Sequence, residues 1–173
     1  MADNIWDSIL IPVDFSKYSA AALKLGLELA PKVARRLIVL HVGVDPTDMP
    51  GFKQSGKAEQ KVTRKVEDTS QDRFEAFLDE HDVKKALKDT PVKLEKILVQ
   101  GRPLQAILDC IKKEKPSLVI MGSRGHTRSP HVLIGSKAER VMQLSPAPVM
   151  VVKPPSKKAG KKDKDKEKGE KNK

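Results

Sequence analysis

Five short, mostly apolar runs, separated by longer segments with helical periodicity, constrain the fold of this chain most strongly. Such runs are too short for helices and are typical of strands that are buried on both faces of a sheet. Strands that alternate with helices predict a mostly parallel sheet, covered on both faces by right-handed crossovers. We therefore expect a single α/β domain with a doubly wound, five-stranded, mostly parallel sheet. Its predicted strands span residues 5–13, 36–44, 90–100, 117–121 and 149–152.

The segments between these runs carry signals for helix ends. Ser16 is placed to cap the first helix, because apolar residues recur after it at spacings of three and four. Residues 58–88 predict a long surface helix with a break near residues 81–82. Pro103 stands in a first helical turn, where its missing N–H is tolerated. Residues 136–139, Ser-Lys-Ala-Glu, have the sequence of a capping box, which predicts that the serine caps the last helix.

The C-terminal segment differs from the rest of the chain in composition. Residues 154–173 contain nine lysines, four acidic residues and no strong hydrophobe, and they carry +5 of the chain's net charge of +11. Such a segment cannot bury enough apolar surface to offset its chain entropy, so we expect it to be a disordered tail. It has no aromatic residue for base stacking and alternates lysines with acids, so we do not expect it to bind nucleic acid.

Composition also excludes several classes of protein. The single cysteine, Cys110, excludes an intrachain disulfide framework and a multi-cysteine zinc site, and its apolar neighbours predict a buried, inert thiol. The acidic N-terminus does not have the basic start of a signal peptide. No apolar stretch approaches the roughly 20 residues that span a bilayer. We therefore expect a cytoplasmic protein without membrane contact.

A glycine-bearing segment joins the fourth predicted strand to the last predicted helix. Gly122 and Gly125 follow the strand, and Gly135 precedes Ser136 at the start of the helix. Glycine lets backbone N–H groups approach a ligand closely, and a helix N-terminus adds unpaired donors at the positive end of its dipole. We interpret this segment as a cradle for phosphate. The simpler alternative is that the three glycines serve only turns and caps.

Separated motifs in this sequence resemble those of the universal stress protein family. The pattern Gly122-x2-Gly125-x9-Gly135-Ser136 resembles the nucleotide-binding signature of that family. The segments Ile-Leu-Ile-Pro-Val-Asp-Phe-Ser at 9–16, Leu-His-Val at 40–42 and Ala-Pro-Val-Met-Val-Val at 147–152 resemble its strands. The resemblance implies a Rossmann-like, adenine nucleotide alpha hydrolase-like fold. It also implies a nucleotide-binding domain over residues 1–153, in the branch of the family that binds ATP.

The same resemblance implies where ATP, or a related adenine nucleotide, is held. The ligand would lie at the carboxyl ends of the first, second and fourth strands. The nucleoside would be lined by Pro12, Val13 and Asp14, with Val42 meeting adenine through its backbone. The residues implied around ribose and phosphates are Met121, Gly122, Arg124, Gly125, Gly135 and Ser136. Asp14 has a second possible role, as an Asx-type cap on the first helix, and the two roles are compatible.

Lys137 departs from the family, which usually has a small or apolar residue after Gly-Ser. A lysine in the first turn opposes the helix dipole at a cost of about 0.3 to 1 kcal/mol, and a bound phosphate would reverse that sign. Lys137 therefore either contacts the terminal phosphate or is a solvated surface lysine. No carboxylate in the motif is placed to hold a metal, so Mg²⁺ would be coordinated by phosphates and water. His41, which ends the second strand, is expected to be structural or partner-facing.

These observations favour a cytoplasmic protein that binds ATP and acts in stress response or regulation. In the family the last strand pairs across a two-fold axis, so the resemblance implies a homodimer through residues 149–152. One alternative is a slow ATPase or nucleotidyl-transferring enzyme, although no lysine follows the glycine loop in Walker order. Another is a partner or nucleic-acid interaction module with a vestigial nucleotide site.

Overall fold

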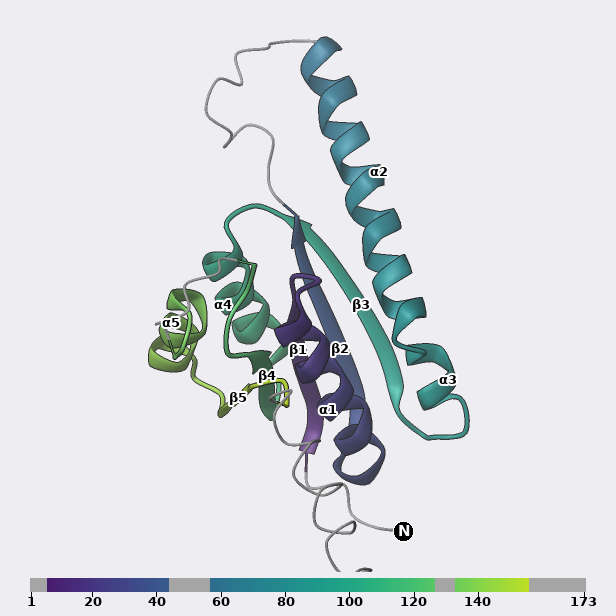
Figure 1. Ribbon diagram of the computed structural model, residues 1–173, viewed down its shortest axis with the longest axis vertical. Helices are drawn as coiled ribbons and strands as arrows, with labels where there is room; N and C mark the ends of the chain where they lie inside the picture. The colour runs from purple at the N-terminus through teal and green to yellow at the C-terminus, as the bar shows by residue number, and fades with distance from the viewer. Residues whose placement is uncertain (1–5, 44–56, 127–132, 156–173) are drawn as a thin grey trace, which may run out of the picture.

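The computed structural model describes residues 6–43, 57–126 and 133–155, and for residues 57–67 it describes the backbone alone. The predicted tail falls almost entirely outside these ranges, because residues 156–173 are not described. Within the described ranges the chain alternates strands with helices from its first strand to its last (Figure 1). The alternation expected from the sequence is therefore confirmed.

Five strands form one sheet in the order β3-β2-β1-β4-β5, and every neighbouring pair is parallel. The chain builds outward from the central strand β1 to β2 and β3, and then crosses back to add β4 and β5 on the other side. The direction of building therefore reverses between β1 and β4, as the doubly wound prediction requires. The strands are β1 (Trp6–Val13), β2 (Ala34–Gly43), β3 (Lys93–Gln100), β4 (Leu118–Gly122) and β5 (Val149–Val152).

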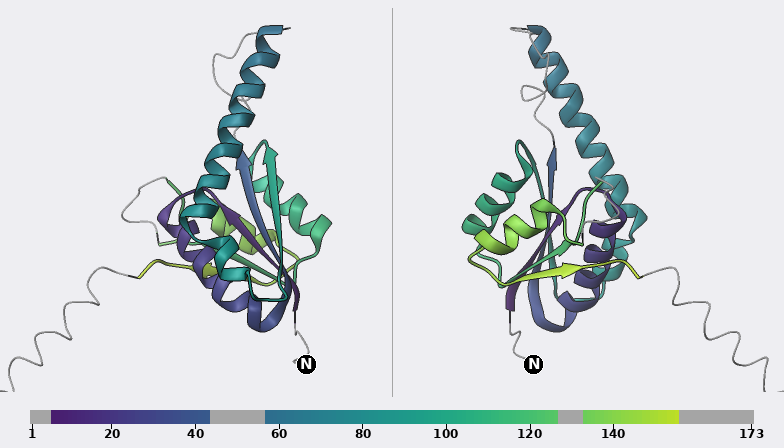
Figure 2. Two further views of the ribbon diagram at one scale, coloured as in Figure 1. Left: turned by 90° about the vertical axis from the view of Figure 1, so that its right-hand side faces the viewer. Right: turned by 60° about the vertical axis from the view of Figure 1, so that its left-hand side comes forward.

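Helices cover both faces of the sheet (Figure 2). One face packs against α1 (Lys17–Val33), α2 (Lys57–Glu80) and α3 (Val83–Leu87). The other packs against α4 (Pro103–Glu114) and α5 (Ser136–Leu144). None of the helices in the described ranges combines the length and the apolar character needed to cross a membrane.

The core has two layers because successive strand residues point to opposite faces. In β1, Ile9 and Ile11 pack toward α1, α2 and α3, whereas Leu10 between them packs toward α4 and α5. All three side chains are fully buried. Burial on both faces explains why the central strands are continuous apolar runs rather than alternating patterns.

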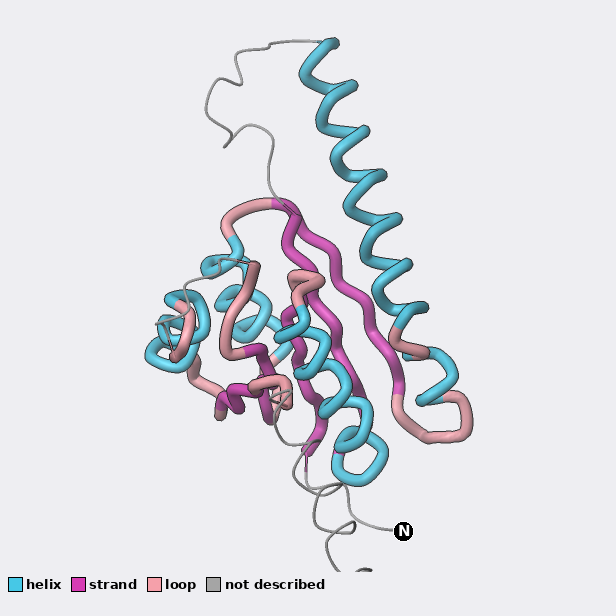
Figure 3. Tube along the Cα trace, viewed as in Figure 1, coloured by secondary structure: helices cyan, strands magenta, loops and turns pink. Residues whose placement is uncertain are grey.

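Most predicted helix ends are confirmed. Ser16 caps α1 by accepting a hydrogen bond from the Ser19 N–H at 3.2 Å. The long surface helix breaks between α2 and α3 as expected (Figure 3). At the break Asp82 has a left-handed conformation with φ of 51°. Pro103 is the first residue of α4. The third strand begins later than predicted, because Thr90 turns the chain by donating its hydroxyl to the Leu87 carbonyl at 2.9 Å.

The predicted capping box at the start of α5 is wrong by one residue. Gly135 is the N-cap, with an extended conformation, and its carbonyl accepts from the Glu139 N–H at 3.0 Å. Ser136 is therefore already inside the first turn and does not cap the helix. The reason is tertiary: the Gly135 N–H donates to the Ser123 carbonyl at 2.7 Å, which fixes Gly135 as the last extended residue before the helix.

Candidate functional site

The ladder between β1 and β4 stops before either strand ends. It pairs Ile9 with Leu118 and Leu10 with Val119, whereas β1 runs on to Val13 and β4 to Gly122. Over these last residues the facing edges of the two strands have no β-ladder partner in the described register. Ligands of open parallel sheets bind outside the carboxyl ends of strands at such a reversal point. This place in the sheet is therefore the candidate site.

The second strand is open at the same end. The last residue of β1, Val13, pairs with His41, and β2 then continues through Val42 and Gly43. On their other side Val42 and Gly43 pair with β3. Beyond the end of β1, the edge of β2 that faces the site therefore presents the backbone of Val42. A backbone contact from Val42 to a planar base is geometrically available here.

Three predicted site residues, two at the nucleoside and one at the ribose and phosphates, can offer only backbone groups. Pro12 is buried, the Val13 side chain packs in the core under α1, and Met121 packs in the core under α4 and α5. Val13 and Met121 are only 4% and 6% exposed. Their contribution to a ligand is thus restricted to backbone groups at the ends of β1 and β4, and Pro12 offers only its C=O because proline has no N–H.

Asp14 lies between α1 and the segment from Gly122 to Gly135, which we call the glycine loop. Its Oδ1 accepts from the Ser16 N–H at 3.1 Å, and its own N–H donates to Ser19 Oγ at 3.3 Å, so the Asx-type role left open by the sequence is present. Its other oxygen, Oδ2, faces Gly125, where a Cβ would come within 2.5 Å of it. The His126 Nε2–H also donates to the Asp14 carbonyl at 2.6 Å. The glycine loop is therefore hydrogen-bonded to the residue that follows β1, and Gly125 lies close to the carboxylate of that residue.

The three motif glycines have different surroundings. A Cβ on Gly122 would lie 2.6 Å from the Tyr18 carbonyl carbon, so this glycine lets α1 pack closely against β4. Gly125 makes room for the Asp14 carboxylate. Gly135 has space for a Cβ, 3.4 Å from the nearest atom, the Arg124 Cα, and serves as the helix cap. Packing thus accounts for Gly122, and Gly125 and Gly135 shape the loop beside the helix N-terminus.

The polar residues of the loop differ in what they can reach. The Arg124 guanidinium lies over the Tyr18 ring, 5.9 Å from its centroid. Ser136 and Lys137 are exposed in the first turn of α5. Ser123 was missed by the sequence reasoning: its hydroxyl is fully buried and makes no hydrogen bond among the described residues. Its place between two motif glycines was the signal that could have identified it. The other basic residues between Gly125 and Gly135, except His126, are Arg128 and His131, and they lie outside the described residues.

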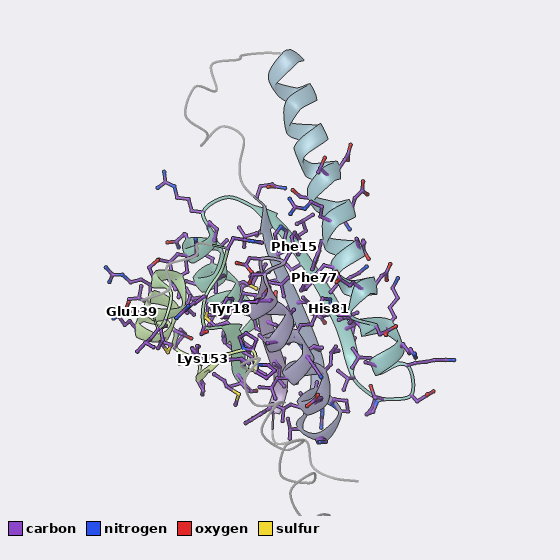
Figure 4. The ribbon with its side chains drawn as sticks, in the orientation of Figure 1. Phe15, Tyr18, Phe77, His81, Glu139 and Lys153 are labelled. Atoms are coloured by element: carbon purple, nitrogen blue, oxygen red, sulfur yellow. The ribbon has the colours of Figure 1, made fainter. Side chains whose placement is uncertain are left out.

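A cluster of rings supports the end of β1 from the side of α2. His41 is 9% exposed, and its Nδ1–H donates to the Val13 carbonyl at 2.9 Å. The Phe15 ring lies 4.1 Å from the His41 ring and 5.3 Å from the Phe77 ring, measured between centroids. Figure 4 shows Phe15 beside Phe77 of α2. Burial lowers the pKa of His41, and the positive charge of Arg73 lowers it further, against opposing effects of the Val13 hydrogen bond and the Asp14 charge.

Metal binding and thiol chemistry are the two other kinds of site to consider among the described residues. Among them, no group of three or more His, Cys, Asp or Glu side chains could hold a metal ion. Burial, the largest cause, raises the pKa of Cys110 to about 11. Its thiol is therefore protonated at neutral pH, as expected of an inert core cysteine.

This sequence is similar to those of a known family and its members. The model of the universal stress protein family matches residues 6–153. Universal stress protein MJ0531 from Methanocaldococcus jannaschii is 30% identical over 155 residues, which cover 90% of this chain and 86% of that protein. Universal stress protein MJ0577 from the same organism is also 30% identical, over 86% of this chain and 96% of its own length.

Solved structures give the same assignment. The structure of MJ0577 matches with a TM-score of 0.70 and covers 88% of this chain and 99% of its own. A family member from Arabidopsis thaliana with AMP bound matches with a TM-score of 0.58 at 18% identity, over 87% of this chain and 93% of that one. A universal stress protein in complex with cAMP matches with a TM-score of 0.57 at 19% identity, over 86% of this chain and 98% of that one. The last two similarities concern the fold alone. The family model and the 30% identical relatives together establish that this chain belongs to the universal stress protein family.

Proposed function

We propose that this protein binds an adenine nucleotide at the carboxyl ends of β1, β2 and β4. The observation that carries the proposal is the early end of the ladder between β1 and β4, directly beside the glycine loop and the N-terminus of α5. This arrangement combines an open sheet edge for a flat base with a helix N-terminus for an anion.

In the proposed complex the nucleoside lies along the ends of the strands. Pro12, Val13 and Met121 contribute backbone groups, because their side chains are buried in the core. Val42 meets adenine through the backbone that β2 presents beyond the end of β1. Asp14 contacts the sugar while its Oδ1 keeps the Ser16 bond, so its two predicted roles coexist.

The phosphates lie at the glycine loop and the start of α5. Gly135 has no side chain that could accept from the first-turn N–H groups, which leaves those donors for an anion. A phosphate there would also turn the unfavourable position of Lys137 in the first turn into a favourable one. We assign phosphate contacts to Gly122, Arg124, Gly125, Gly135, Ser136 and Lys137. Mg²⁺ would be bound by the phosphates and water.

ATP is the nucleotide that we test first. The AMP and cAMP in the two relatives above support an adenine nucleotide as the ligand class. The helix N-terminus together with Arg124 and Lys137 offers positive charge for more than one phosphate. A regulatory protein that responds to stress through nucleotide occupancy fits this site better than an enzyme with dedicated turnover.

Native mass spectrometry of the freshly purified protein tests the proposal. We expect bound ATP or ADP, identified after release, or binding of added ATP with Mg²⁺ by titration calorimetry. Lys137→Ala should weaken ATP more than AMP, because only the longer phosphate chain reaches its ammonium group. A protein that is purified empty and binds no added adenine nucleotide would contradict the proposal. Steady release of phosphate or pyrophosphate would instead assign an enzymatic activity.

We also propose that the protein is a homodimer formed through β5. This strand lies at the edge of the sheet, where its free side can pair with a second copy. Large apolar side chains are exposed on it and on the neighbouring α5, namely Met150, Met142 and Leu144. Exposed apolar side chains on and near this strand support a protein interface at this edge.

Light scattering after size exclusion tests the dimer. Met150→Lys should shift the protein to a monomer, because it places a charge at the centre of the proposed interface. Glu80→Lys, which adds the same side chain at the exposed end of α2, should leave a dimer. A wild-type monomer at micromolar concentration would contradict this part of the proposal.

A further inference from the structure

A buried histidine that belongs to none of the predicted ligand contacts holds the end of the first strand. We propose that His41 is a positioning residue for the nucleotide, because it fixes the Val13-Asp14-Phe15 segment that the ligand must contact. The inference rests on the proposed function and adds to it a residue that acts from the second strand. It concerns the placement of Asp14 and no direct contact between His41 and the ligand.

The first contact that fixes this segment is a hydrogen bond to the backbone. His41 Nδ1 lies 2.9 Å from the Val13 carbonyl oxygen. A carbonyl can only accept, so Nδ1 carries the proton and the tautomer of the neutral ring is fixed. The bond is buried, and it is made at the last residue of β1 that the ladder with β2 pairs. His41 therefore fixes the chain on one side of Asp14.

The second contact that fixes this segment is between two aromatic rings. Phe15 has a φ of 63°, which is a rare conformation for a bulky side chain. Such strain persists only where the surroundings over-determine it, and it concentrates at functional sites. Here the Phe15 ring stacks on His41 at 4.1 Å, contacts Phe77 at 5.3 Å and lies 5.4 Å from the Arg73 guanidinium carbon. His41 therefore also fixes the chain on the other side of Asp14.

Asp14 stands between these two held residues. With its backbone fixed on both sides, its carboxylate has one oxygen on the Ser16 N–H and the other against Gly125. Loss of the His41 donor would free the Val13 carbonyl to turn and would move the carboxylate relative to the glycine loop. A ligand that bridges β1 and this loop would then lose a preorganised contact.

Substitutions at His41 separate positioning from simple core packing. In His41→Asn, the side-chain Nδ2 stands one atom beyond Cγ, as Nδ1 does in histidine, so the donor to Val13 is kept while the ring is lost. In His41→Leu, apolar volume is kept while the donor is lost. Val83→Ala is the control, because Val83 is fully buried in the same core layer but lies on α3. Titration calorimetry with ATP and Mg²⁺ measures affinity, and urea unfolding measures stability for each variant.

We expect the affinity of each variant for ATP to depend on whether position 41 keeps a hydrogen-bond donor to the Val13 carbonyl, and not on how stable the variant is. His41→Leu should bind ATP about tenfold more weakly, because the Asp14 contact to the ligand is no longer preorganised. His41→Asn should lose less, at most about threefold, because it keeps the donor to Val13 and loses only the ring contact with Phe15. Val83→Ala should lose stability and keep its affinity. Nitrogen-15 NMR of His41 should find Nδ1 protonated and Nε2 unprotonated at neutral pH.

Several results would overturn the inference. One is a folded His41→Leu protein that binds ATP as tightly as the wild type, and another is an equal loss of affinity in Val83→Ala. The Nε2–H tautomer in the NMR spectrum would also exclude the proposed hold on Val13. If the wild-type protein binds no adenine nucleotide, the proposed function fails and this inference fails with it. Tight binding by both the wild type and His41→Leu rejects the inference alone.

Discussion

The carboxylate of Asp14 lies directly against the α-carbon of Gly125, so that a Cβ on this glycine would come within 2.5 Å of Asp14 Oδ2. The two residues belong to loops that follow different strands on the two sides of the reversal point in the sheet. The hydrogen bond from His126 to the Asp14 carbonyl joins the same two loops. The candidate site is therefore a pair of loops in mutual contact, and a change in one should be felt in the other.

Gly125→Ala tests this contact. The added Cβ must displace the Asp14 carboxylate, which is the end of a short side chain, so we expect a stability loss of only about 1 kcal/mol. Nucleotide affinity should fall by about tenfold, because Asp14 is no longer where the ligand needs it. Gly135→Ala is the matched control, since its Cβ meets only ordinary contacts at 3.4 Å and beyond and the backbone groups proposed to contact phosphate are kept. Calorimetric titration of both variants checks the prediction, and equal affinities would contradict it.

Gly122→Ala should instead act on stability. Its Cβ would lie 2.6 Å from the Tyr18 carbonyl carbon and 2.8 Å from the Tyr18 oxygen, which are backbone atoms of α1 and cannot rotate away. Helix α1 must then move off β4, at a cost of about 2 kcal/mol in the free energy of unfolding. Urea denaturation followed by circular dichroism measures this cost. An unchanged midpoint would mean that α1 does not pack on Gly122 as described.

The fold was predictable because its signals are local. The apolar run that contains Ile9, Leu10 and Ile11 can be buried on both faces only inside a parallel sheet, and the helices between the runs determine the fold class. Ser16 was identified as a cap because its partner, the Ser19 N–H, is three residues away. Signals of this kind are complete within a few residues of sequence.

The details of the site were less predictable because they depend on contacts between distant segments. Gly135 rather than Ser136 caps α5, since the Ser123 carbonyl binds the Gly135 N–H. Likewise, the motif identified Gly122 but did not indicate that α1 packs on it through Tyr18, more than a hundred residues earlier in the chain. A motif identifies such residues without indicating which partner each of them has.

The corrected helix cap leads to a comparison within the chain. Ser16→Ala removes a side-chain cap on α1, so we expect a loss of about 1 kcal/mol in the free energy of unfolding. Ser136→Ala removes a hydroxyl inside the first turn of α5 and should leave the stability unchanged or slightly higher, because alanine has the higher helix propensity. Denaturant unfolding of the two single variants measures the difference. An equal loss in both would restore the capping-box prediction.

The strained backbone of Phe15 predicts a difference between two truncations. Phe15→Ala and Phe15→Gly both remove the ring contacts with His41 and Phe77, so the loss of packing is shared. Only alanine keeps the penalty of a φ near 63°, which is about 1 kcal/mol for a residue with a Cβ. We therefore expect Phe15→Gly to be the more stable of the two by about that amount. The same stability in both variants would mean that the turn relaxes once the ring is gone.

The buried His41 should make stability depend on pH in the mildly acidic range. Burial, the largest cause, lowers its pKa in the folded protein below the value of about 6.5 that it has in the unfolded chain. As the pH falls through 6.5, the unfolded chain takes up a proton that the folded protein does not, so the free energy of unfolding decreases. The slope from this one group is at most about 1.4 kcal/mol per pH unit, and it ends once the folded protein is also protonated.

His41→Asn cannot titrate, so the difference between its pH profile and that of the wild type isolates His41. Urea unfolding at pH values from 7.5 to about 5 measures both profiles, and parallel profiles would show that His41 is not held neutral by burial.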